Sequence, residues 1–142
     1  MRHRVVCLLI GVAASLLLLG AACSDDDSQE RGAGASQSSG QKFPDVIDVA
    51  ISGESGSYDF DVTVSSPYDS PERYADGWRV VAPDGTVLGE RPLAHDHANE
   101  QPFTRSLTGV EIPADITEVT VEARDLVNDY GGATLTEALP DR

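Results

Sequence analysis

The stretch YDFDVTVS, residues 58–65, decides the expected fold. Apolar side chains occupy every second position, and aspartate, threonine or serine fills each position between them. In a β-strand, successive side chains point to opposite faces, so this order gives one apolar face and one polar face. The stretch therefore predicts a strand that packs one face on a core and turns the other to water. The apolar residues are Tyr58, Phe60, Val62 and Val64.

The same two-residue period continues on both sides of this stretch. In VIDVAIS, residues 46–52, we expect Ile47, Val49 and Ile51 to share one face, and GESGS, residues 53–57, is a turn. Downstream, WRVVAPDGTVLGE, residues 78–90, has proline second and glycine fourth in Ala82–Gly85. That order is typical of a type I turn followed by a left-handed glycine, so it predicts a hairpin.

Three later segments complete the pattern. PFTRSLTG (residues 102–109), ITEVTVEAR (116–124) and GGATLTEAL (131–139) alternate or are short and apolar, and no segment keeps a 3.6-residue period. We therefore expect an all-β domain over residues 43–142, a single seven-stranded antiparallel sandwich. Arg105 shares a predicted inner face with Phe103 and Leu107, so it must either pair with a carboxylate or be rotated outward by a bulge.

Residues 45–140 resemble immunoglobulin-like domains, and fibronectin type III domains more closely. Trp78 falls where these folds place a core aromatic on the third strand, and SLTGVEIPADITEVTVEARD, residues 106–125, resembles the passage from strand E to strand F. Ile116 and Thr117 stand near the usual place of a tyrosine, and the chain lacks the cysteine pair. The resemblance implies a monomeric, non-catalytic binding or interaction module whose partner is an unknown protein or small ligand.

The amino terminus has the pattern of a signal peptide over residues 1–22. Arg2 and Arg4 precede an uncharged, largely apolar run from Val5 to Leu19, and Gly20-Ala21-Ala22 then leads to Cys23. This end resembles a bacterial lipoprotein, in which Cys23 would be lipidated, with palmitate among its acyl chains. The resemblance implies anchoring at the extracytoplasmic face of the cell membrane, facing the surface or the periplasm. The alternative is an ordinary secretory signal cleaved near Ala22, which would leave a free thiol.

The segment after the signal peptide, residues 23–42, is predicted to be a flexible acidic tether, because between Ser24 and Gln41 it has no large apolar residue. Removing residues 1–22 takes away two arginines and no acid, so the mature chain has 8 basic and 24 acidic residues, a net charge of −16. Such a charge repels nucleic acids and anionic lipid headgroups. Cys7 would leave with the signal peptide, so no internal disulfide is expected.

Catalytic motifs are absent, and the sequence predicts no enzyme. GESGS lacks the residue between serine and glycine that a nucleophile elbow requires. A small hydrolase would need a serine that the fold brings to the histidines. Calcium ligands could come from acids of the predicted loops, but their spacing is not that of an EF-hand, so we expect them to be solvent-facing. These acids are Asp69, Glu72, Asp76, Asp125 and Asp129.

Two histidines, His95 and His97, lie in LAHDHANEQPF, residues 93–103. In an extended segment both imidazoles leave the same side of the backbone, about 6.6 Å apart at Cα. They could converge on copper or zinc, with Glu90 or Glu100 supplying an oxygen ligand. Otherwise they are ordinary loop residues, and the chain needs no cofactor.

A different ligand, such as a carbohydrate, would require exposed aromatic side chains. Tyr58, Phe60 and Trp78 are assigned to the core. The aromatics expected to be free for a ligand are Tyr68, Tyr74 and Tyr130.

Overall fold

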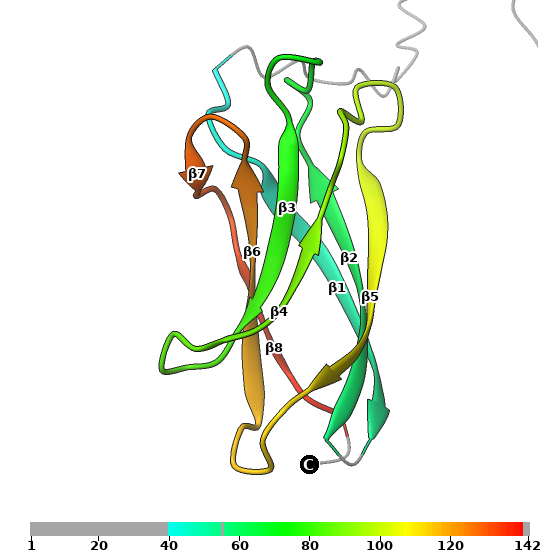
Figure 1. Cartoon of the computed structure of the whole chain (residues 1–142), viewed down its shortest axis with the longest axis vertical. Helices are drawn as coiled ribbons and strands as arrows, with labels where there is room; N and C mark the ends of the chain where they lie inside the picture. Colours follow the sequence, from blue (N-terminus) through cyan, green and yellow to red (C-terminus); the bar gives the residue numbers. More distant parts are fainter. Residues whose placement is uncertain (1–39, 55, 141–142) are drawn as a thin grey trace, which may run out of the picture. The chain divides into compact units, whose positions relative to one another are not determined.

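The structure, a computed structural model, describes residues 40–54 and 56–140. All regular secondary structure in these ranges is β, and none of the described residues forms a helix that could span a membrane (Figure 1). The strands are β1 (Asp45–Glu54), β2 (Ser57–Ser65), β3 (Ala75–Val81), β4 (Val87–Pro92), β5 (Phe103–Glu111), β6 (Glu118–Asp125), β7 (Asp129–Tyr130) and β8 (Leu135–Ala138).

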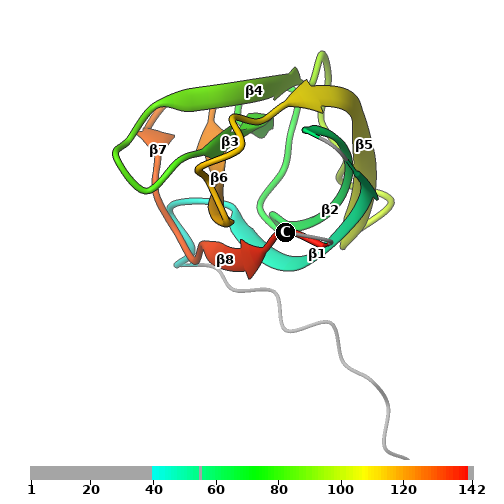
Figure 2. The same ribbon diagram turned by 90° about the horizontal axis from the view of Figure 1, so that it is seen from below.

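The strands form two antiparallel sheets. One sheet has the order β1-β2-β5, and the other has the order β4-β3-β6, with β7 and β8 both pairing with the remaining edge of β6. The sheets lie face to face, with β4 near β5 on one side and β8 near β1 on the other (Figure 2). The prediction of an all-β antiparallel sandwich is confirmed.

The core lies between the two sheets and is built from alternate residues of each strand. The apolar residues of β2 are fully buried, as the alternation predicts. Trp78 and Val80 of β3 meet them from the opposite sheet, together with the inward residues of β6. The buried side chains of these three strands are those of Tyr58, Phe60, Val62, Val64, Ala75, Trp78, Val80, Val81, Val119, Val121 and Ala123, with Asp125 at the end of β6.

A β-bulge in β1 contradicts the expected face of Ile47. Val46 pairs with Val64, but the next pair is Asp48 with Thr63, so Ile47 is the extra residue. The bulge reverses the alternation before it: Val46 is buried, whereas Ile47 is about half exposed. Val49 and Ile51, after the bulge, remain packed against the core.

The hairpin between β3 and β4 has the predicted turn. The Gly85 N–H donates to the Ala82 carbonyl at 2.9 Å, and the φ of Gly85 is +88°. Glycine is favoured there because a Cβ is strained at positive φ. The turn lies at the end of the sandwich opposite the loop between β4 and β5 (Figure 1).

The predicted last strand, residues 131–139, contains only β8, and the two-residue strand β7 precedes it. Between them, Ala133 donates to the Asp45 carboxylate at 2.7 Å and accepts from the Val46 N–H at 2.9 Å. Gly132 has a φ of +86°, and a Cβ there would clash with the Pro44 carbonyl oxygen. The edge strand therefore leaves β6 at this point to contact the start of β1.

Two of the loop acids expected in solvent are buried, so that expectation is wrong for Asp69 and Asp125. Asp125 accepts hydrogen bonds from the backbone of Val127 and Asn128 and pairs with Arg73 at 3.0 Å. These bonds replace the water that the carboxylate loses, and they lower the pKa of Asp125 despite its burial. Such carboxylates bind the backbone N–H groups of the loops.

The remaining loop acids differ in exposure. Asp76 is half-buried and holds Arg124 through two hydrogen bonds of 2.8 and 2.9 Å. Glu72 and Asp129 are exposed, as expected.

The burial of Trp78 gives a test of the fold. Trp78→Ala should lower the free energy of unfolding by about 3–5 kcal/mol, because it removes the largest side chain of the core. Val127→Ala, at a site 65% exposed, is the control and should change it by less than about 0.5 kcal/mol. Urea unfolding followed by circular dichroism measures both; equal values for the two variants would contradict the assigned core.

Candidate metal site

The two histidines lie in the loop between β4 and β5, and this loop is held at both ends. At its start Leu93 is buried, and its N–H donates to the Asp76 carbonyl at 2.9 Å. At its end the Gln101 amide accepts from the Ser66 N–H at 2.7 Å and donates to the His97 carbonyl at 3.2 Å. The loop is therefore fixed to the neighbouring segment after β2.

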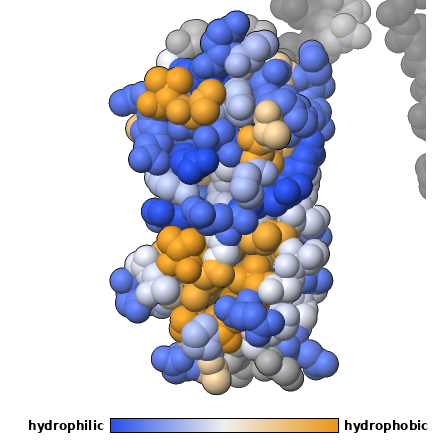
Figure 3. Space-filling model, viewed as in Figure 1, coloured by the Kyte–Doolittle hydropathy of each residue, from blue (hydrophilic) through white to orange (hydrophobic). Residues whose placement is uncertain are grey.

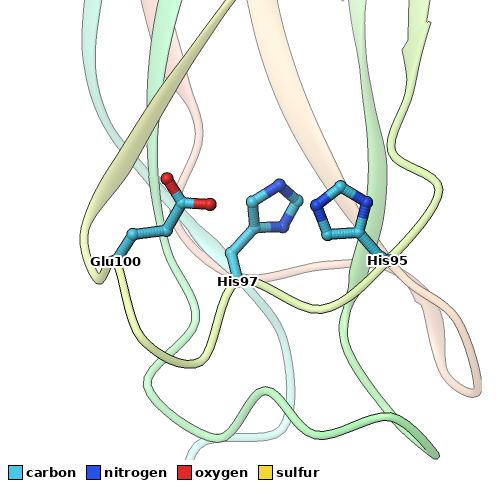
Figure 4. Close-up of side chains that lie close together, drawn as sticks. All are labelled: His95, His97 and Glu100. Atoms are coloured by element: carbon cyan, nitrogen blue, oxygen red, sulfur yellow. The ribbon is translucent and has the colours of Figure 1, made fainter.

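Local hydrogen bonds fold the loop back on itself. The Asp96 carboxylate accepts from the Ala98 N–H at 3.3 Å, and the Glu100 N–H donates to the His97 carbonyl at 3.1 Å. This turn brings Glu100 back toward the histidines. One potential ligand atom each from His95, His97 and Glu100 lies within 4.8 Å of the other two, and Figure 4 shows the three side chains side by side.

The three side chains differ in how firmly they are held. His97 is buried, with its ring stacked on Phe103 at 3.9 Å between centroids and 14° between planes. The His95 ring lies 4.9 Å from His97 at 26°. His95 and Glu100 are exposed. The cluster therefore combines one buried imidazole with two exposed side chains.

Asp69, a buried carboxylate, lies behind His97. Its Oδ2 accepts the His97 backbone N–H at 3.0 Å and lies 4.0 Å from the ring Nδ1, while its Oδ1 accepts from the Ala75 N–H at 3.1 Å. Nδ1 of His97 is buried and has no hydrogen-bond partner among the described residues. A carboxylate near Nδ1 favours the tautomer with the proton on Nδ1, which leaves the lone pair of Nε2 for an ion.

Burial also keeps this imidazole neutral. Loss of solvent lowers the pKa of His97 below its ordinary value, and the charge of Arg105 lowers it further. The carboxylates of Glu100 and Asp69 act in the opposite direction but are weaker. Because only a neutral imidazole can donate its lone pair to a metal, the environment of His97 favours coordination at neutral pH.

Arg105 pairs with the third member of the cluster. Its Nη2 lies 2.8 Å from Oε1 of Glu100, and its Nη1 donates to the Thr104 carbonyl at 2.8 Å. The register of β5 is regular from Phe103 to Leu107, so no bulge turns Arg105 outward. Arg105 therefore has a carboxylate partner, but the pair lies at the surface and not inside as expected, since Glu100 is exposed. An ion at the cluster would compete with this guanidinium for Glu100.

The other proposed metal ligand, Glu90, lies elsewhere. It projects from β4, and its Oε1 accepts a hydrogen bond from the Tyr130 hydroxyl at 3.1 Å. The cluster of potential ligands found among the described residues contains Glu100 and not Glu90. Cys23, the predicted lipidation site, lies outside the described residues.

The three tyrosines expected to be free for a ligand are only partly exposed. The Arg79 guanidinium lies 3.6 Å from the ring centroid of Tyr130, and that of Arg73 lies 4.1 Å from the centroid of Tyr68. Burial and the nearby carboxylate of Asp125 raise the pKa of Tyr68 far above its ordinary value. Tyr74 is half-buried. A guanidinium thus already covers one face of Tyr68 and of Tyr130.

Asp69 is the residue of the candidate site that sequence reasoning missed. It lies 28 positions before His97, and the sequence suggested only a calcium-type loop acid. The hydrogen bond to the His97 backbone forms because the segment after β2 and the β4–β5 loop meet at one end of the sandwich. No local sequence pattern predicts the contact between these two segments.

Comparison with known proteins found no matching family model, no matching curated protein and no matching solved structure. Function is therefore argued from the residues themselves.

The lowered pKa of His97 predicts a pH dependence of stability. The unfolded chain takes up a proton at an ordinary imidazole pKa of about 6.5, whereas the folded chain does so only at lower pH. His97 should therefore contribute stability that is complete above pH 6.5 and is lost as the pH falls toward the folded-state pKa. Urea unfolding at several pH values should show a smaller loss for His97→Gln than for the wild type.

The control for this measurement is His95→Gln, at the exposed histidine. It should keep the larger part of the wild-type decrease in stability at low pH, because burial and Arg105 lower the pKa of His97 more than His95 does. An unchanged decrease in His97→Gln would show that the environment of His97 does not disfavour its protonation.

Proposed function

We propose that the chain is a membrane-anchored, extracytoplasmic lipoprotein whose β-sandwich is a non-catalytic module that binds copper(II) or zinc at His95, His97 and Glu100. The observation that carries this proposal is the convergence of three potential ligand atoms within 4.8 Å, one of them on an imidazole fixed by Phe103 and Asp69. The sequence alone shows that Glu100 lies five residues after His95, but it does not show that their side chains lie close together.

The potential ligand atoms lie farther apart than they would around a bound ion, but the difference is small. Around a tetrahedral ion with bonds of about 2.0–2.1 Å, neighbouring donors lie about 3.3 Å apart. The three atoms must therefore approach by about 1.5 Å at most, and His95 and Glu100 can do so because they are exposed. Three protein ligands leave a further coordination position for water or for a ligand from another molecule.

The types of donor restrict the metal. Imidazole suits zinc and copper, and a single carboxylate fits either ion, whereas calcium and magnesium prefer oxygen ligands only. The cysteines of the chain are Cys7 and Cys23, both far from the cluster in sequence, so a thiolate site of the type that selects copper(I) is not expected here. Divalent copper should bind more tightly than zinc, following the usual order of divalent affinities.

The strand arrangement supports a binding module. In immunoglobulin constant domains, strands C, F and G form one sheet, and strands A, B, E and D form the other. Here β3, β6 and β7/β8 correspond to the former and β1, β2 and β5 to the latter, with β4 on the edge of β3. Such sandwiches bind ligands through the loops at their ends, and His95 and His97 lie in one of these loops.

Metal titration tests the proposal. The full-length chain, purified in detergent, should bind one Cu(II) with a dissociation constant below about 10 μM. Binding should weaken steeply as the pH falls through about 6.5, because protonated imidazoles cannot coordinate. Calorimetry and the visible spectrum of bound Cu(II) provide the measurements, and a lack of saturable one-to-one binding of either Cu(II) or Zn(II) would refute the proposal.

Matched variants locate the site. The double change His95→Ala and His97→Ala should weaken binding at least about 100-fold, more than the loss of an outer-shell partner does. Glu100→Gln should also weaken it, whereas Glu90→Gln removes the same charge from β4 and should leave the affinity unchanged. Equal effects of Glu100→Gln and Glu90→Gln would contradict the ligand set.

The anchoring part of the proposal has a separate test. Cells fed an alkyne analogue of palmitate should incorporate it into the wild-type chain, because Cys23 follows a signal-peptide pattern. Cys23→Ser should incorporate none. Unlabelled wild type, released as a secreted protein cleaved near Ala22, would support the alternative with a free thiol.

A further inference from the structure

A groove lies at the end of the sandwich opposite the histidine loop. It runs between the β3–β4 hairpin and the connection from β5 to β6, and its volume is about 410 Å³. That size falls within the range of about 300–1,000 Å³ typical of ligand pockets. Neither His95, His97 nor Glu100 lines it.

The groove has apolar walls. Leu88 and Ile116 are half-buried and face it from opposite sides, and Pro83 and Pro113 extend each wall outward. Val87, 43% exposed, precedes Leu88 on the edge strand β4. In Figure 3 apolar surface gathers over this lower part of the molecule. Exposed apolar surface of this kind, rimmed by polar residues, marks interaction sites.

The rim of the groove is acidic. Asp84 lies on the hairpin side, Asp115 and Glu118 lie on the other side, and all three are exposed. No lysine or arginine lines the groove. The Asp84 carboxylate is held in place by the Thr86 N–H at 2.9 Å, and hydrogen bonds from Thr86 lower its pKa. The groove therefore presents negative charge on both sides of its apolar lining residues, and the carboxylate on the hairpin side is fixed.

We propose that this groove binds a segment of a partner protein in which an apolar side chain is flanked by lysine or arginine. The apolar side chain would lie between Leu88 and Ile116, and the flanking cations would meet Asp84 on one side and Asp115 and Glu118 on the other. Charge selects this occupant: a second copy of the chain would bring an identical acidic rim and a net charge of −14. Electrostatic complementarity of this kind sets specificity and speeds encounter.

The position of the groove suits such a partner. Gln41, at the start of the described chain, donates to the Ser65 carbonyl, next to Ser66, whose N–H is bonded by Gln101 of the histidine loop. The chain thus enters at the histidine end, and the groove lies at the other end (Figure 1). A partner bound at the groove would leave the histidine end of the domain accessible.

Three capped peptides test the inference on the ¹⁵N-labelled full-length chain in zwitterionic lipid nanodiscs. Arg-Leu-Arg should shift the amide resonances of groove residues saturably, with a dissociation constant in the range of about 0.1–1 mM expected for so short a ligand. Arg-Ser-Arg, without the apolar side chain, and Glu-Leu-Glu, with opposite charge, should bind at least about tenfold more weakly.

Charge variants locate the peptide. The pair Asp115→Asn and Glu118→Gln should weaken Arg-Leu-Arg binding about fivefold or more, whereas Asp48→Asn with Glu72→Gln removes the same charge from exposed positions outside the groove and should not. The proposal would be overturned if Arg-Leu-Arg did not saturate the chain below 5 mM, which is about fivefold above the expected range. Equal binding of Arg-Ser-Arg and Arg-Leu-Arg, or resonance shifts confined to surfaces outside the groove, would also overturn it. So would equal effects of the two variant pairs on Arg-Leu-Arg binding. Metal binding is measured separately, so either proposal can fail alone.

Discussion

The fold depends on the burial of one face of β2 against Trp78. Tyr58, Phe60, Val62 and Val64 are fully buried, and β2 is the central strand of its sheet, with β1 and β5 on its two edges. Trp78 meets this face from β3, which is central in the opposite sheet. Because the cysteines lie at positions 7 and 23, the described domain has no disulfide to supplement this core. Its stability must come from apolar burial and hydrogen bonding.

Buried carboxylates then fix the loops on this core. Removing an ionised carboxylate from water is unfavourable unless hydrogen bonds or ion pairs compensate. Asp69 receives N–H groups from Ala75 and His97, and Asp125 receives those of the turn that follows it and the guanidinium of Arg73. The cost of burying each carboxylate is therefore compensated only when the surrounding loops adopt these positions. For Asp69 the consequence is functional, because the loop that it fixes carries the His97 ring.

The sequence predicted what depends on neighbouring residues and missed what depends on distant ones. Alternation identified the inward faces of β2 and β6, and the turn chemistry of Gly85 identified the hairpin, because both signals are local. Ile47 was misplaced because a one-residue bulge reverses a period of two without any mark in the composition.

The candidate site was predicted in the same partial way. His95 and His97 were identified from their two-residue spacing. Glu90 and Glu100 each lie five residues from His95 along the chain, so both were named as possible oxygen ligands. The fold decides between these two acids. The turn in which the Glu100 N–H donates to the His97 carbonyl brings Glu100, and not Glu90, close to the histidines. The buried Asp69 could not be found, because its partner comes from a loop between different strands.

The candidate metal site combines a rigid half with an adaptable half. His97 is held by Phe103, His95 and Asp69, so its donor atom needs no rearrangement. Glu100, in contrast, is engaged by Arg105 in the ion-free chain, and an incoming cation must share or displace that guanidinium. The nearby positive charge opposes a bound cation, and ordering two exposed side chains reduces the affinity further. If the proposed site binds an ion, we expect it to exchange that ion with other molecules more readily than a structural metal site closed by four fixed ligands does.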